Sequence, residues 1–165
     1  MTGDWTANIR MEELLERASA LSREYSLNTD TEQLDKLFFP PFKQLRDCVI
    51  ISDKPVNILE DFFDKAIKLH GDKTGYESSC GETRINCYFR NKISVLVGIK
   101  IAMMVLKIWG LHLKKLEPQS NFCMIMCCDE CNVEIGFHKI HIGEKMWLDN
   151  NLEKYTHEAV GYMII

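Results

Sequence analysis

The fold is decided by two apolar stretches, NFCMIMCC at residues 121–128 and VEIGFHKI at residues 133–140, which the polar turn DECN at 129–132 separates. Two apolar runs of this length around a polar turn are typical of a β-hairpin. In the second run Val133, Ile135 and Phe137 alternate with more polar or smaller residues. This period of two predicts a sheet with one buried face and one wet face, and it places His138 on the exposed face.

A third apolar run, AVGYMII at residues 159–165, closes the chain. Between the hairpin and this run, Gly143 marks a turn and residues 149–153 read as a short polar helical turn. The three runs together predict a small C-terminal antiparallel sheet of about three strands.

The N-terminal two thirds of the chain are expected to be helical. Apolar residues recur at three- and four-residue steps over residues 8–25, which predicts one amphipathic helix. Capping-box spacing opens a second helix over residues 29–38, and the prolines that follow end it. A third helix is expected to begin near Pro55 and to stop at Gly71.

The longest expected helix runs over residues 93–116 and is apolar except for lysines 100, 107 and 114. Seven residues advance two helical turns, so these lysines form one narrow stripe. The stretch is long enough to cross a bilayer, but two lysines inside it would cost several kcal/mol there. We therefore interpret it as a central buried helix, with the lysine stripe in water and every other face covered by protein.

Two segments are less regular. Residues 42–51 suit a helix or a strand equally well, and residues 71–81 are polar and Gly-rich, as in a long surface loop. The whole pattern predicts one α+β domain over residues 1–165, with the long central helix packed on the C-terminal sheet.

Composition favours a cytoplasmic protein. The N-terminal residues carry acidic side chains and no apolar core of the kind that a signal peptide needs. Seven cysteines, an odd number, are expected to be free thiols in a reducing compartment. The 24 acidic and 20 basic residues give a net charge of −4, which argues against broad binding to a phosphate backbone and favours a basic partner or none.

Four residues raise the alternative of a small zinc- or nucleic-acid-binding module, namely Cys128, Cys131, His138 and His141. Only six residues separate the two pairs, and on a strand the two histidines would point to opposite faces. We therefore expect no metal, no other cofactor and no catalytic residue, and we do not expect an enzyme. Cys80 comes just after a predicted helix cap, and a helix N-terminus can lower the pKa of a thiol, so a thiol-dependent activity is a weaker alternative.

The C-terminal segment resembles bacterial immunity proteins encoded beside contact-dependent growth inhibition toxins. The resemblance rests on NVEIGFHK at 132–139, GEKMWL at 143–148, NLEKY at 151–155 and the closing apolar strand. It covers about a quarter of the chain and contains no catalytic signature.

The resemblance implies a non-enzymatic cytoplasmic protein that binds the C-terminal toxin domain of a cognate effector one-to-one and blocks its active site. Many such toxins are nucleases, for example tRNA-cleaving RNases, and a nuclease displays a basic cleft that carboxylates can fill. No membrane and no direct nucleic-acid partner is expected. The candidate toxin-binding residues are acidic or aromatic: Glu60, Asp61, Asp64, Asp129, Glu130, Trp147, Asp149, Glu153 and Tyr155.

Overall fold

The computed structural model describes residues 5–21 and 27–165. In chain order its elements are β1 (Thr6–Ala7), α1 (Ile9–Ala20), α2 (Thr31–Phe38), β2 (Phe42–Leu45), β3 (Cys48–Ile51), α3 (Val56–His70), α4 (Lys73–Gly81), β4 (Thr83–Arg84), the 3-10 turn η1 (Ile85–Tyr88), α5 (Val95–Leu116), β5 (Phe122–Cys128), β6 (Val133–Lys139), the 3-10 turn η2 (Leu152–Lys154) and β7 (Ala159–Ile164).

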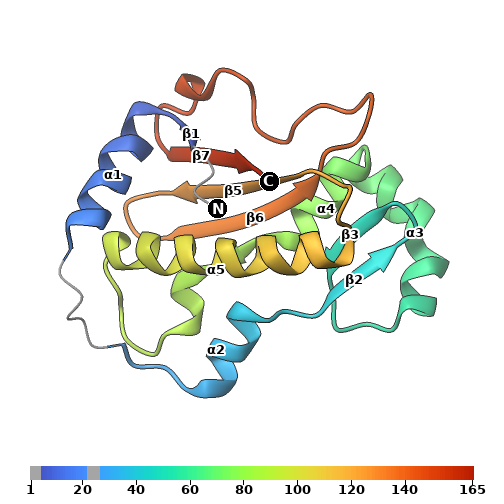
Figure 1. Ribbon diagram of the computed structural model, residues 1–165, viewed down its shortest axis with the longest axis horizontal. Helices are drawn as coiled ribbons and strands as arrows, with labels where there is room; N and C mark the ends of the chain where they lie inside the picture. Colours follow the sequence, from blue (N-terminus) through green and yellow to red (C-terminus); the bar gives the residue numbers. More distant parts are fainter. Residues whose placement is uncertain (1–4, 22–26) are drawn as a thin grey trace.

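The main sheet has five antiparallel strands in the order β1-β7-β5-β6-β4 (Figure 1). β5 lies in the middle, and it pairs with β6 from Phe122↔Lys139 to Cys128↔Val133 and with β7 on its other side. The two-residue strands β1 and β4 extend the sheet at its edges. β2 and β3 form a separate two-stranded sheet.

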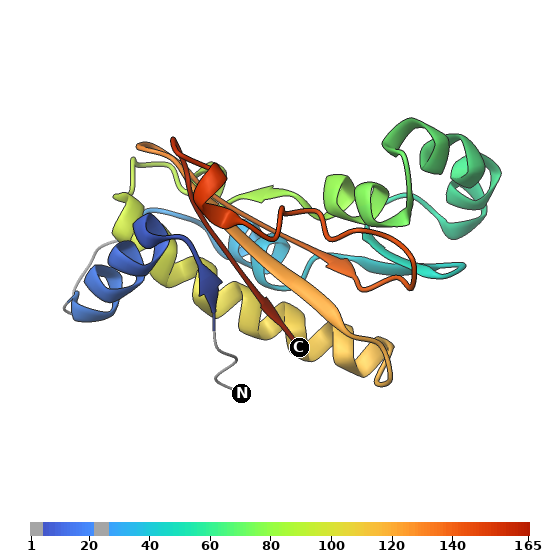
Figure 2. The ribbon, with the colours of Figure 1, turned by 90° about the horizontal axis from the view of Figure 1, so that it is seen from above.

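One face of the main sheet packs on α5, which runs along the strands (Figure 2). Trp109 of α5 is fully buried, and its Nε1 donates a hydrogen bond of 2.9 Å to the carbonyl of Leu37 in α2. By length and composition α5 could cross a membrane, yet here it lies against the sheet. Its outer face is less covered than expected, because Met104 and Leu111 are exposed beside Lys107.

The other face of the sheet is covered by the segment between β6 and β7, which arches over the strands in Figure 1. A small apolar cluster forms beneath this segment, where Leu148 and Leu152 pack on Cys123, Ile125 and Val160. The predicted exposure of His138 is therefore wrong. His138 does point to this outer face, but the segment covers it and leaves the side chain buried.

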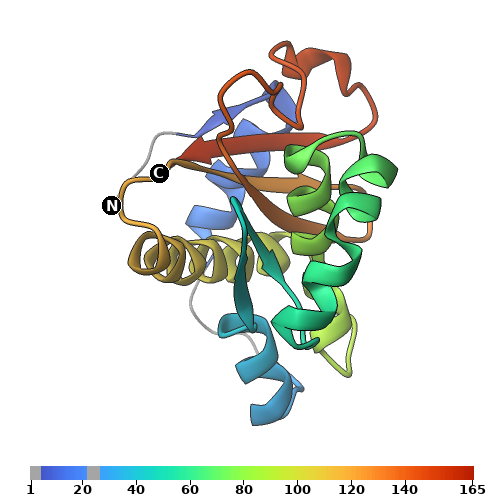
Figure 3. The ribbon, with the colours of Figure 1, turned by 90° about the vertical axis from the view of Figure 1, so that its right-hand side faces the viewer.

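The helices α3 and α4 and the β2–β3 hairpin lie together at one end of the sheet (Figure 3). They share an apolar cluster of their own, separate from the main core, formed by Leu45, Cys48, Ile50, Phe63 and Tyr76. Gly71 ends α3 with a φ of 92°, a conformation that glycine adopts without strain, as the sequence predicted.

The predicted fold is wrong in its sheet. The structure is α+β, but within residues 5–21 and 27–165 seven strands form a five-stranded and a two-stranded sheet in place of one C-terminal sheet of about three strands. Strands β1 and β4 were missed because two-residue strands carry no periodic pattern. The helix α4 replaces the loop predicted at 71–81, since Asp72 caps its first turn by accepting from the Gly75 amide at 2.7 Å.

Candidate functional site

The outer face of the sheet is hollowed at the end where β5 turns into β6. An open groove of about 530 Å³ lies between this hairpin and the covering segment, lined by Arg84, Cys127, Cys128, Asp129, Asn132, Glu134, Trp147, Leu148, Tyr155, Glu158 and Val160. A smaller hollow of about 80 Å³ shares Cys127, Glu134 and Trp147 with it and reaches Ser78 and Glu82 at the end of α4. We call the two together the acidic groove.

Strand geometry explains the floor of the acidic groove. Cys127 and Glu134 are directly paired across β5 and β6, so both side chains point outward from the sheet. Two residues along β6, Gly136 is the next outward position and has no side chain. The missing side chain at Gly136 leaves space between β6 and the end of α4, and this space forms part of the smaller hollow.

The charge in the acidic groove is predominantly negative. Asp129, Glu134, Glu158 and Glu82 face a single basic group, Arg84, whose Nε donates to Glu134 Oε1 at 2.6 Å. Burial, together with the charges of Glu158, Glu134 and Glu82, raises the pKa of the Cys127 thiol to about 12. Three carboxylates thus act on this one thiol, which stays protonated and unreactive at neutral pH.

Two aromatic rings border the acidic groove. The side chain of Trp147, one of the candidate toxin-binding residues, is 55% exposed. Tyr155 is half-buried, and its hydroxyl accepts a hydrogen bond of 3.0 Å from the Asp149 amide. An exposed tryptophan beside several carboxylates is the composition expected of a protein-binding surface.

The structure brings together three of the nine candidate toxin-binding residues, Asp129, Trp147 and Tyr155, in the acidic groove. Asp149 and Glu153 lie nearby in the covering segment but hold local structure. Asp149 pairs with Lys154 at 2.7 Å, and Glu153 accepts from the Ile9 amide at 3.0 Å. Glu130 lies on a different hollow, beside α1.

The remaining three candidates lie on α3, apart from the acidic groove. Glu60 and Asp64 form ion pairs with the guanidinium of Arg46, at 2.9 Å and 2.8 Å. The same guanidinium lies over the Phe63 ring, 4.5 Å from its centroid. Only Asp61 is left as an exposed carboxylate on this patch without a partner among the described residues.

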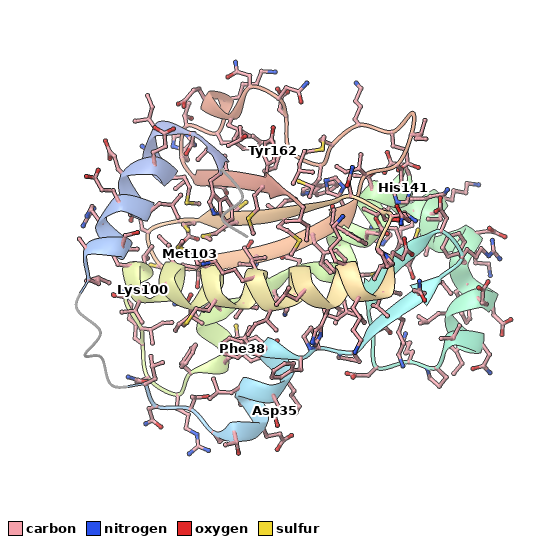
Figure 4. The ribbon with its side chains drawn as sticks, viewed as in Figure 1. Asp35, Phe38, Lys100, Met103, His141 and Tyr162 are labelled. Carbon is pink, nitrogen blue, oxygen red and sulfur yellow. The ribbon has the colours of Figure 1, made fainter. Side chains whose placement is uncertain are left out.

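A second polar cluster is buried where α4 meets β3 and β6, close to the labelled His141 in Figure 4. Glu77 is fully buried, and its carboxylate accepts from the Val49 amide at 2.6 Å, from the Lys139 amide at 2.8 Å and from His141 Nε2 at 3.0 Å. Burial favours neutral His141, but Glu77 and the charges of Glu144 and Asp47 outweigh it and raise the pKa of the imidazole. Glu77 of α4 is therefore hydrogen-bonded to β3, to β6 and to the segment that follows β6.

The ligand atoms of Cys48, Glu77 and His141 lie within 4.8 Å of one another, a spacing from which a metal site can be built. The hydrogen bonds argue against one. His141 lies between Glu77, 3.0 Å from Nε2, and Asp47, 3.6 Å from Nδ1, and these carboxylates favour the protonated imidazole, which has no free lone pair for a metal. Burial also raises the pKa of the Cys48 thiol to about 12, which disfavours the thiolate.

The alternative zinc site is not assembled. Cys128 pairs with Val133 at one end of the β5–β6 hairpin, whereas His138 pairs with Cys123 near the other end. Five residues of strand, roughly 17 Å, separate the two, far beyond the reach of one ion. Cys131 is exposed in the turn and His141 is buried beside Glu77.

A family model matches residues 6–164 of the chain, and its description is the Uncharacterized protein PM0498 family. The chain belongs to this family. No curated protein and no solved structure matches it. The match spans every described strand and helix, so the acidic groove and the Glu77 cluster both lie inside the region that defines the family.

Sequence reasoning missed Glu77, Glu82, Glu134 and Glu158. Glu82 and Glu134 come together because α4 ends beside β6, and that contact depends on a helix that looked like a loop. One signal was available, since Glu134 occupies an outward position in the alternating β6 pattern.

Proposed function

We propose that this protein is a cytoplasmic immunity protein, which binds the C-terminal toxin domain of a contact-dependent growth inhibition effector one-to-one and blocks its active site. It acts by binding and catalyses no reaction. The observation that carries the proposal is the acidic groove, where four carboxylates surround an exposed tryptophan.

A nuclease toxin attracts phosphates with a basic cleft, and the acidic groove presents the complementary charge. Complementary fields speed association and reject wrong partners, while a central aromatic side chain supplies much of the binding energy. The same negative charge repels nucleic acid, so the groove favours a protein partner over the substrate of that partner.

The first experiment is co-expression with the C-terminal domain encoded immediately beside this chain, scored by growth and by co-purification. We expect rescue and a one-to-one complex. Toxicity without rescue, or rescue without a complex, would contradict inhibition by direct binding.

Variants then locate the binding surface. Trp147→Ala should weaken the complex about 30-fold or more, because truncation of an interface tryptophan costs about 2 kcal/mol or more. Phe62→Ala is the matched control, because Phe62 is 57% exposed on α3, away from the acidic groove. Equal affinities of these two variants would exclude Trp147 from the interface.

A charge-reversal pair tests electrostatic steering. Glu158→Lys in the acidic groove should slow association at low salt, and the difference from the unmodified protein should shrink as salt rises. Asp61→Lys on α3 makes the same charge change outside the groove. If Asp61→Lys slows association more than Glu158→Lys does, the toxin binds the α3 patch instead.

A further inference from the structure

Ser78 lines the smaller hollow of the acidic groove, and its buried hydroxyl has no hydrogen-bond partner. Ser78 of α4 is 7% exposed, and its Oγ is the single buried side-chain polar atom without a hydrogen-bond partner in the described part of the chain. A buried hydroxyl is normally paired, and leaving one unpaired costs free energy. Because Ser78 lines the hollow, a ligand that entered there could satisfy it.

The groups around Ser78 select the charge of such a ligand. Glu82 and Glu134 line the same hollow, and Arg84 already occupies one oxygen of Glu134. Glu82 is exposed and has no ion-pair partner among the described residues. The hollow therefore offers a free carboxylate and a hydroxyl oxygen, both of which accept hydrogen bonds from a cation.

The shape of the hollow limits the ligand further. Its volume of about 80 Å³ is several times the ~10–15 Å³ that one water needs, so it takes a group of several atoms. Gly136 leaves space on one side, since a Cβ built there would meet nothing closer than 3.9 Å. Trp147 borders another side with an aromatic surface.

We propose that this hollow binds the guanidinium group of an arginine side chain presented by the protein partner. The inference rests on the proposed function for its partner, a basic toxin domain, and it names the side chain that enters the acidic groove. The guanidinium pairs with Glu82, donates to Ser78 Oγ and lies against the Trp147 ring.

Arginine suits the hollow better than lysine does. A guanidinium is planar, donates from several N–H groups at once and stacks on aromatic rings, whereas an ammonium is a compact and strongly hydrated charge. Its several N–H groups can donate to a carboxylate and to a hydroxyl at the same time. A neutral group of the same shape makes the same hydrogen bonds, but these are weaker because they lack the charge.

The test uses the full-length chain and three acetylated, amidated tripeptides with glycine on both sides of arginine, citrulline or lysine. Binding is followed by NMR through the indole N–H of Trp147 and the amides of Glu82 and Gly136. We expect saturable shifts with the arginine peptide and at least tenfold weaker binding of the citrulline peptide, which has the same shape without the charge. The lysine peptide should bind more weakly than the arginine peptide.

Three variants place the arginine in the hollow. Glu82→Gln should weaken binding of the arginine peptide about fivefold to tenfold, and Ser78→Ala about threefold, without loss of folding because Ser78 Oγ holds nothing in place. Asp35→Asn, an exposed carboxylate on α2 labelled in Figure 4, should leave binding unchanged.

Equal binding of the arginine and citrulline peptides, no saturable shift, or equal effects of Glu82→Gln and Asp35→Asn would overturn the proposal. An unchanged affinity of Ser78→Ala would overturn the placement of the guanidinium against Ser78. If the toxin is neutralised but the arginine peptide does not bind, the proposed function stands without this site. If the arginine peptide binds but the toxin is not neutralised, the site stands and the immunity role fails.

Discussion

At the scale of single residues, the buried carboxylate of Glu77 connects several elements through hydrogen bonds. Glu77 accepts hydrogen bonds from the amides of Val49 and Lys139 and from the His141 ring, so it joins β3, β6 and the segment after β6 to α4. A buried carboxylate is tolerated only when it is paired and hydrogen-bonded, and here three donors meet that condition. Composition could not identify it, because Glu77 lies in a polar, Gly-rich stretch whose burial depends on tertiary contacts.

Glu77→Ala should lower the free energy of unfolding by about 3–5 kcal/mol, because it leaves two backbone amides and the His141 imidazole buried without their acceptor. Urea denaturation followed by circular dichroism measures the change. Asp35→Asn removes an exposed carboxylate from α2 and should change stability by no more than about 0.5 kcal/mol. A loss below about 1 kcal/mol for Glu77→Ala would show that the cluster is not a structural centre.

Two buried histidines should give opposite pH dependences. Burial lowers the pKa of His138, whereas Glu77 and its neighbours raise the pKa of His141 against the effect of burial. A histidine with a raised folded pKa stabilises the fold below its unfolded pKa of about 6.5, and this contribution is lost as pH rises through the folded value. A histidine with a lowered folded pKa stabilises the fold above about 6.5, and this contribution is lost as pH falls through the folded value.

His138→Gln removes the His138 contribution, so relative to the unmodified protein its unfolding free energy should fall as pH rises from about 5.5 through about 6.5. His141→Gln removes the His141 contribution and should show a relative rise as pH increases from about 6.5 towards 8.5. Urea denaturation at a series of pH values gives both slopes, and the other histidines cancel in the comparison. Slopes of the same sign would contradict the opposite shifts.

At the scale of elements, the sequence predicted what has a long, regular pattern. The helix α5, the β5–β6 hairpin and the glycine stop of α3 all lie where periodicity and turn residues placed them. The β2–β3 hairpin was ambiguous because four-residue strands show too little alternation, and α4 was hidden by its composition. In α4 small residues allow close approach to β6, so that a Cβ at Gly81 would lie 3.1 Å from the Phe137 ring.

Two glycines in α5 should respond differently to alanine. A Cβ at Gly98 would lie 2.8 Å from Cγ2 of the buried Val133, whereas a Cβ at Gly110 would meet only the flexible end of Ile165 at 2.9 Å. Alanine gains about 1 kcal/mol of helix propensity at either site, and overpacking costs about 1–3 kcal/mol where the neighbour cannot move. Thermal unfolding should therefore show that Gly98→Ala is less stable than Gly110→Ala. If Gly110→Ala were the less stable variant, Val133 in β6 would shift to accommodate a Cβ more easily than Ile165 does.

At the scale of the whole molecule, two apolar cores meet along the β2–β3 hairpin, where Val49 is buried in the main core and Ile50 in the second. The main core lies between α5 and the sheet, and the second lies among α3, α4 and the β2–β3 hairpin. Between them, Glu77 receives the Val49 amide and Lys139 pairs with Asp47 at 2.8 Å. The sequence could predict neither the second core nor this connection, because both depend on β2, β3 and α4. The acidic groove lies beside this boundary, at the end of α4.

This division should appear in native-state hydrogen exchange as two levels of stability. The second core is small, and α3 exposes Phe62 and Leu69 to solvent, so α3 buries less apolar surface than α5 does. Regions with less buried apolar surface open at lower free energy than the global unfolding reaction. The amides of α3 should therefore exchange through a partial opening that leaves β5, β6 and β7 protected, and Glu77→Ala should lower the free energy of that opening. If the amides of α3 and β5 exchange at one common free energy, the two cores unfold as a single unit.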